Sequence, residues 1–178
     1  EAIHGTLIAC DDFGTLVQAE AFFAALPWRD SASPVALFDH WNQRFGEAAT
    51  AFDDVETVLG ELQRRGIRMG VVTNGGAAMQ RAKIATLGLE RFMSAIVISS
   101  EVGLRKPDAA IFRRALADLG CAAQETWFVG DHLDLDVRDA RDAGLTAFWV
   151  RTGAFAAADD LPGHRLERLG DLLTHLAP

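Results

Sequence analysis

Residues 126–136 read Thr-Trp-Phe-Val-Gly-Asp-His-Leu-Asp-Leu-Asp, an apolar run that leads directly into an acidic loop. The apolar run is typical of a buried strand, and the glycine marks the point where the strand ends. In open α/β sheets, ligands bind beyond the carboxyl ends of the strands. The stretch therefore predicts a strand of an α/β sheet, followed by a loop with two functional acids, Asp131 and Asp136.

Similar apolar runs recur along the chain and alternate with amphipathic helices. The other expected strands cover residues 6–10, 67–72, 95–99 and 145–150. Apolar residues at helical spacing predict one helix between Asp53 or Asp54 and Gly66, and another between Asp108 and Gly120. A last helix is expected over residues 166–176. The alternation predicts the α/β class, with a Rossmann-like parallel sheet covered by helices on both faces.

One stretch, residues 17–53, interrupts this alternation. A helical segment over residues 17–26 is expected to end at Pro27. Ser33-Pro34 is typical of an N-cap followed by proline at the first helical position, so a second helix is expected to start there. We interpret residues 17–53 as a small helical cap inserted after the first strand, and residues 1–16 and 54–178 as the α/β core.

Composition and charge exclude several classes of protein. With 17 Lys and Arg against 25 Asp and Glu, the net charge is −8, which argues against non-specific nucleic-acid binding. No run approaches the roughly 18 apolar residues that span a membrane, and the chain starts without a signal-peptide pattern. Two cysteines, Cys10 and Cys121, are too few for a disulfide framework. We expect a cytoplasmic monomer or homodimer that binds neither nucleic acid nor membranes.

Polar residues follow four of the expected strands. Besides the acidic loop after residue 129, the segments are Asp11-Asp12-Phe13-Gly14-Thr15, Thr73-Asn74-Gly75-Gly76 and Arg105-Lys106-Pro107-Asp108. Each segment alone is compatible with ordinary turn or helix-start chemistry. Together and in this order, they predict a functional site at the carboxyl edge of the sheet.

These residue types predict nucleophilic chemistry on an anionic substrate. Asp11 is a candidate nucleophile that could divide hydrolysis into two displacements through an aspartyl intermediate. The Thr73 hydroxyl and the N–H groups of residues 74–76, which open the next helix, are suited to an anion. Lys106 supplies a positive point charge.

The carboxylates of this site predict a metal ion. Asp11, Asp131 and Asp136 would repel one another unless a cation lay among them, and Mg²⁺ prefers such oxygen ligands. The cation would also offset the charge of an incoming anionic substrate.

In their order and spacing, these segments resemble the four motifs of the haloacid dehalogenase-like superfamily. The resemblance covers almost the whole chain and implies that Asp11 is the nucleophile, while Thr73 and Lys106 hold the transferring group. It implies Mg²⁺ ligands at Asp11, Asp131, Asp136 and the carbonyl of Phe13, with Asp131 favoured as a direct ligand. Candidate substrate-binding residues are Asn74, Gly75 and, from approximate position in the cap alone, Arg44.

Phe13 departs from the pattern of the superfamily's phosphatases, which have Asp at this position. That Asp protonates the leaving group and activates water, and losing such a general acid/base typically costs about 10²–10⁴-fold in rate. Family dehalogenases have an aromatic Tyr there, because halide leaves without a proton. They typically have Ser-Ser-Asn, however, where this chain has Gly130-Asp131-His132. A good leaving group, or His132 acting as the acid/base, could bypass the missing Asp.

The acidic loop favours phosphoryl transfer over these alternatives. We expect a hydrolase that uses an aspartate nucleophile and Mg²⁺ to cleave a small phosphorylated or phosphonate metabolite. One alternative is a metal-independent 2-haloacid dehalogenase in which Asp11 displaces halide. The other is a catalytically weak member of the fold with a binding or regulatory role. The resemblance specifies no substrate.

Overall fold

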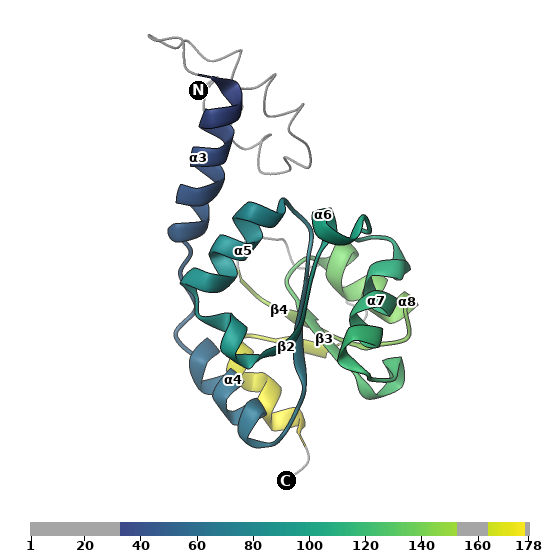
Figure 1. The fold of residues 1–178 in the computed structure, drawn as a ribbon. Helices are drawn as coiled ribbons and strands as arrows, with labels where there is room; N and C mark the ends of the chain where they lie inside the picture. Colours follow the sequence, from purple (N-terminus) through teal and green to yellow (C-terminus); the bar gives the residue numbers. More distant parts are fainter. Residues whose placement is uncertain (1–32, 153–163, 177–178) are drawn as a thin grey trace.

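The computed structural model describes residues 33–152 and 164–176 (Figure 1). In one parallel sheet, strand β1 (Met69–Thr73) pairs with β2 (Met93–Ile98). In the other, β3 (Trp127–Gly130), β4 (Thr146–Val150) and β5 (His164–Leu166) pair in the order β3-β4-β5, all parallel. The predicted parallel α/β architecture is confirmed. The expected strand over residues 6–10 and the helix over residues 17–26 lie outside the described residues.

The helices flank the strands on both sides (Figure 1). The longer ones are α3 (Pro34–Glu47), α4 (Val55–Arg64), α5 (Ala77–Thr86) and α7 (Ala109–Leu119). Short α-helices are α6 (Ser99–Val102) and α8 (Asp139–Asp142). The remaining helical elements are the 3₁₀ segments η1 (Leu89–Phe92), η2 (Ala123–Glu125) and η4 (Leu169–His175), and the π-helical segment η3 (Leu133–Arg138).

The helix limits predicted from capping residues are confirmed. Helix α7 begins after Asp108, whose carboxylate accepts a hydrogen bond from the Ala110 N–H at 2.8 Å. It ends at Gly120, which has a φ of 63°. Such a positive φ costs glycine little because it has no Cβ. Helix α4 ends just before Gly66, which has a φ of 72°, and it buries Val58 and Leu62 as its spacing predicts.

The last helix of the chain was predicted too long. Leu166 belongs to strand β5, where its side chain is fully buried, and only residues 169–175 are helical, as a 3₁₀ segment. Strand β5 was missed because it is only three residues long and two of them, His164 and Arg165, are polar. Its pairing with β4, rather than an apolar run, makes it a strand.

Helix α3 lies within the predicted cap and packs against α5 of the core (Figure 1). As predicted, it begins after Ser33, with Pro34 in the first turn. The contact is close because Gly46 is buried, and a Cβ at this position would lie 2.4 Å from the Ala82 Cβ. No structural boundary tests the division at residue 53, so the cap stays a prediction.

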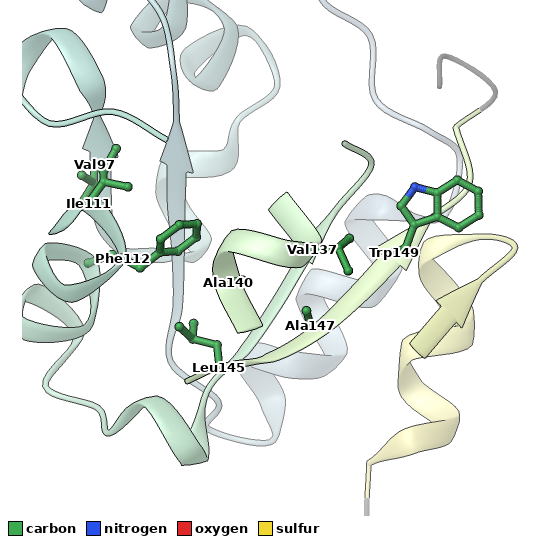
Figure 2. Packing of buried hydrophobic residues seen from close by; sticks show 9 residues of the cluster. Val97, Ile111, Phe112, Val137, Ala140, Leu145, Ala147 and Trp149 are labelled. Carbon is green, nitrogen blue, oxygen red and sulfur yellow. The ribbon is translucent and has the colours of Figure 1, made fainter. Parts of the chain in front are cut away.

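The core has two apolar clusters, which share strand β4. Ala147 and Trp149 point into the first cluster, which Figure 2 shows with Phe112 of α7 and Val137 of η3. Phe148, between them in sequence, packs in the second cluster with Val58 and Leu166. Alternate side chains of a strand point to opposite faces, so β4 is covered on both faces. No helix of the described residues is long and apolar enough to span a membrane.

Candidate active site

The structure brings three of the four predicted loops together. Thr73 ends β1 and Gly130 ends β3, so the loops that follow lie at the carboxyl ends of their strands. Lys106, from the loop after α6, lies between them and makes hydrogen bonds to both. The remaining loop, with Asp11 and Phe13, lies outside the described residues, so their roles stay predictions.

Asn74 connects the β1 loop to the Lys106 loop through two hydrogen bonds. Its Oδ1 accepts from the Lys106 backbone N–H at 2.9 Å, and its Nδ2 donates to the Lys106 carbonyl at 3.0 Å. The Gly75 N–H donates to the Ser99 Oγ at 3.0 Å. These bonds hold the backbone of Lys106 in register with the end of β1. That Asn74 and Gly75 contact substrate stays a prediction.

Lys106 and Asp136 form a largely buried ion pair. Lys106 Nζ lies 2.5 Å from Asp136 Oδ1, and their side chains are only 11% and 9% exposed. Asp136 Oδ2 accepts a hydrogen bond from the His132 backbone N–H at 3.1 Å. Both carboxylate oxygens are thus engaged, and the ammonium group is fixed on its long stem. In this structure, Asp136 acts as the counter-ion of Lys106, and its predicted role as a metal ligand stays a prediction.

Gly130 provides the space that Asp136 needs. A Cβ on Gly130 would lie 2.4 Å from Asp136 Cβ and 2.5 Å from Asp136 Oδ2. Real Cβ atoms essentially never approach other atoms so closely, so a larger residue would displace the carboxylate. The glycine of the Gly-Asp pair therefore has a specific packing reason, in addition to ending the strand.

Asp131 is anchored at its backbone and at one carboxylate oxygen. Its carbonyl accepts a hydrogen bond from Trp149 Nε1 at 2.8 Å, and its Oδ2 accepts from the Thr152 hydroxyl at 2.9 Å. Among the described residues, Asp131 Oδ1 makes no hydrogen bond. This oxygen is a hard donor of the kind that Mg²⁺ prefers.

The described residues alone do not assemble a complete metal site. No group of three His, Cys, Asp or Glu side chains within this part of the chain is placed to hold a metal ion. This finding is compatible with the predicted set, because two of its members, Asp11 and the Phe13 carbonyl, lie outside the described residues.

One ring nitrogen of His132 is engaged in a backbone hydrogen bond, so any catalytic role would fall to the other nitrogen. Its Nδ1 accepts a hydrogen bond from the Leu135 N–H at 3.2 Å, at the start of η3. A neutral imidazole that accepts at Nδ1 carries its proton on Nε2. Any acid/base chemistry by His132 would therefore use Nε2.

Asp139, which directly follows η3, is a half-buried acid. Its Oδ2 is buried and has no hydrogen-bond partner among the described residues. Burial raises the pKa of the Asp139 carboxyl above its ordinary value, and the nearby acids Asp142, Asp134 and Asp136 raise it further. Sequence patterns do not identify this group, since it is one of several acids close together between residues 131 and 142.

Two polar residues at the site were missed by the sequence analysis. Gln80 Nε2 donates to Thr73 Oγ1, and Thr152 donates to Asp131. Sequence patterns could have identified Gln80 from its position in the first turns of the helix that follows the Thr73 loop. Arg44, by contrast, pairs with Glu47 of its own helix at 3.1 Å and is 70% exposed. That Arg44 binds substrate stays a prediction.

Comparison with protein families identifies the chain. The model of the haloacid dehalogenase-like hydrolase family matches residues 18–150, about three quarters of the sequence. This chain belongs to the haloacid dehalogenase-like hydrolase family. The match includes three of the four loops and their strands, and it confirms the family resemblance that the motifs indicate.

The similar proteins of known function include several phosphatases. The chain is 43% identical over 102 residues to a phosphoserine phosphatase of Thermus thermophilus, a match that covers 57% of this chain and 41% of the relative. It is 34% identical over 162 residues to a phosphoglycolate phosphatase of Cupriavidus necator, covering 85% and 69%. The chain spans about half the length of most of the curated relatives it matches.

Solved structures confirm the fold. A phosphatase of the family from Thermococcus onnurineus superposes with a TM-score of 0.75 at 22% identity, over 96% of this chain and 77% of the other. A 2-haloacid dehalogenase from Pseudomonas syringae superposes with a TM-score of 0.69 at 27% identity, over 89% and 68%. Both superpositions support the haloacid dehalogenase-like fold of this chain.

Proposed function

We propose that this chain is a Mg²⁺-dependent hydrolase of a small phosphorylated or phosphonate metabolite, with Asp11 as the nucleophile. The observation that carries the proposal is the largely buried Lys106–Asp136 pair, which joins the Lys106 loop to the loop of Asp131, while the Lys106 backbone is bound to Asn74, the residue after Thr73. It fixes a positive charge between the loops that follow β1 and β3, at the sheet edge where ligands of α/β proteins bind. The phosphatase names of the similar proteins support the same chemistry.

The reaction proceeds in two displacements. An oxygen of the Asp11 carboxylate attacks phosphorus, and the bond from phosphorus to the leaving group breaks, which produces an aspartyl phosphate. Water then attacks phosphorus, releasing inorganic phosphate and restoring the carboxylate. Lys106 Nζ and the Thr73 hydroxyl hold the non-bridging oxygens, where negative charge must be stabilised in both steps.

Phe13 restricts the substrates that this site can use well. Its side chain cannot give a proton to the leaving group or take one from water, so the two steps lack the usual acid/base at this position. A substrate with a good leaving group needs less protonation. A poorer leaving group would require another acid, for which His132 Nε2 is the candidate.

Mg²⁺ is proposed on the chemistry of the oxygen donors. Asp131 would hold it together with Asp11 and the carbonyl of Phe13, and the Asp131 Oδ1 fits that role because Oδ2 is already engaged by Thr152. When bound, the ion neutralises charge on the phosphoryl group and the nucleophile. A cytoplasmic monomer or homodimer remains the expected form of the protein.

The second candidate function is hydrolytic dehalogenation of a 2-haloacid. Phe13 favours it because halide leaves unprotonated, and the 27% identical structure is a 2-haloacid dehalogenase. In that reaction, an oxygen of the Asp11 carboxylate attacks the carbon that bears the halogen, and the carbon–halogen bond breaks to release halide. Water then cleaves the resulting ester and restores the carboxylate. Asp131 argues against it, because this chemistry requires no metal-binding carboxylate.

One experiment separates these functions. Phosphate release is measured from a panel of phosphorylated and phosphonate metabolites, with Mg²⁺ or with EDTA, and halide release is measured from 2-haloacids. Asp11→Asn is the catalytic control. Phosphate release that requires Mg²⁺ and Asp11 is the expected result. Halide release that persists in EDTA would instead support the dehalogenase, and no turnover of either class would contradict both proposals.

A further inference from the structure

Gln80 reaches back from helix α5 to the loop that carries Thr73. The helix begins after Gly76, and the Gln80 N–H donates to the Gly76 carbonyl at 3.0 Å, which places Gln80 on the second turn. Helical side chains lean toward the helix N-terminus. The Gln80 amide is therefore directed at the end of β1, and its Nε2 lies 2.7 Å from both Thr73 Oγ1 and the Asn74 carbonyl oxygen.

The contact with Asn74 determines which end of the Gln80 amide faces the loop. A carbonyl oxygen can only accept, so the atom 2.7 Å from it must be the NH₂ group, which has two hydrogens to donate. One hydrogen goes to the Asn74 carbonyl. The other goes to Thr73 Oγ1, which therefore acts as an acceptor toward Gln80.

The Thr73 hydroxyl hydrogen is held only by a long bond. It donates to the Asn74 carbonyl at 3.3 Å, well beyond the roughly 2.7–2.8 Å of a typical O–H···O bond. The same carbonyl accepts a shorter hydrogen bond from Gln80 at 2.7 Å. With one lone pair of Thr73 Oγ1 fixed by Gln80, the hydroxyl can exchange this long bond for a shorter one to an anion at the carboxyl end of β1.

Gly75 allows the approach of Gln80. Its φ is 139°, and a Cβ at this position would lie 2.9 Å from Gln80 Nε2 and 3.2 Å from Gln80 Cγ. Glycine is thus required both for the backbone conformation and for the space that the glutamine fills. The Thr-Asn-Gly segment and Gln80 form one hydrogen-bonded unit. The side-chain amide of Asn74 extends this unit to the backbone of Lys106.

We propose that Gln80 is a positioning residue: by donating to Thr73 Oγ1, it directs the Thr73 hydroxyl hydrogen toward the transferring phosphoryl group. The inference rests on the proposed phosphoryl transfer and adds a residue that acts through Thr73. Gln80 does not touch the substrate. Its effect must therefore disappear when the Thr73 hydroxyl is absent.

A double-mutant cycle tests this dependence, with p-nitrophenyl phosphate and Mg²⁺. Thr73→Val should lower kcat/KM by about 10²-fold, as expected for one lost donor to the developing charge. Gln80→Met, which keeps the length of the side chain but has no donor, should lower it about tenfold, the equivalent of one net hydrogen bond. The double variant should be no slower than Thr73→Val. Losses that multiply, or a Gln80→Met enzyme as fast as wild type, would overturn the proposal.

A matched control and a titratable variant separate positioning from folding. Gln63 on α4 also donates from Nε2 to a backbone carbonyl, that of Arg91 at 3.1 Å, so Gln63→Met removes a similar bond away from the loop and should leave kcat/KM unchanged.

In Gln80→Glu, the carboxylate accepts from Thr73 and draws the hydroxyl hydrogen away, whereas the protonated acid can donate. Its kcat/KM relative to wild type should rise as pH falls, while that of Gln80→Met should stay constant.

Phosphate binding distinguishes failure of this inference from failure of the proposed function. Calorimetry with inorganic phosphate and Mg²⁺ should show about tenfold weaker binding in Gln80→Met, and equal binding in Thr73→Val and the double variant. If wild type hydrolyses no phosphate ester but binds phosphate with this pattern, the proposed function fails and the positioning role stands. If turnover is normal but neither readout depends on Gln80, the positioning role alone fails. Wild type with neither turnover nor phosphate binding overturns both.

Discussion

Asp136→Ala should destabilise the fold because it leaves the Lys106 ammonium group buried without its counter-ion. The pair is separated by 2.5 Å, and the side chains are 11% and 9% exposed. Removing one partner of a buried ion pair typically costs about 3–5 kcal/mol. The substitution also removes the acceptor of the His132 N–H. We expect a loss of about 3 kcal/mol, since Lys106 can recover some solvation by moving.

Urea denaturation is the suitable assay. It is done in EDTA, because a cation that binds only the native state would add to the stability of that state. With a slope of about 2 kcal/mol per M, the midpoint should fall by about 1.5 M. Asp118→Ala is the matched control. Asp118 pairs with Arg114 at 2.9 Å, but the side chains are 37% and 50% exposed, so the loss should be within about 0.5 kcal/mol.

A second comparison tests the reason for the loss. In a Lys106→Met, Asp136→Ala double variant, both charges are absent, so the double variant should be more stable than Asp136→Ala alone. If Asp136→Ala costs no more than Asp118→Ala, or if the double variant is the least stable, the buried ammonium group is not the cause and the reasoning is refuted.

Gly130→Ala should cost about 1–3 kcal/mol of stability and lower phosphate release, because the new Cβ would lie 2.4 Å from Asp136 Cβ. Gly60→Ala in α4 is the control, because nothing lies within 4 Å of a Cβ at that position. This variant should be about 0.5–1 kcal/mol more stable than wild type. Equal changes in stability for Gly130→Ala and Gly60→Ala would contradict the packing argument. Asp139→Asn should stabilise the chain at pH 7, because burial raises the pKa of Asp139 and the native state therefore resists its ionisation. Below the unfolded pKa of about 3.8, both the native and the unfolded state hold the proton, and the wild type loses stability as the pH rises from there through the raised folded pKa. The stability gained by Asp139→Asn, measured by thermal unfolding, should therefore shrink toward pH 4. A gain that is constant with pH would exclude the raised pKa as its cause.

The local features of this protein could be predicted from its sequence. Asp108 and Gly120 mark the ends of α7, and Ser33-Pro34 marks the start of α3, because capping depends on residues only a few positions apart. The order of strands and loops also follows from local patterns. Since the carboxyl ends of parallel strands lie at one edge, this order was enough to place Thr73, Lys106 and Asp131 at a common site.

The contacts within that site depend on the tertiary structure. Sequence patterns predicted a role for Asp136 as a metal ligand, which stays a prediction, but they gave no sign of its pairing with Lys106, 30 positions away. They predicted substrate contact for Asn74, which also stays a prediction, but not that its amide holds the Lys106 backbone. Gln80 carried no motif signal, and β5 became visible only through its pairing with β4. The physical reason is range: periodicity and capping act within a few residues, whereas the partner of a buried charge or amide is whichever group the packed elements bring within about 3 Å.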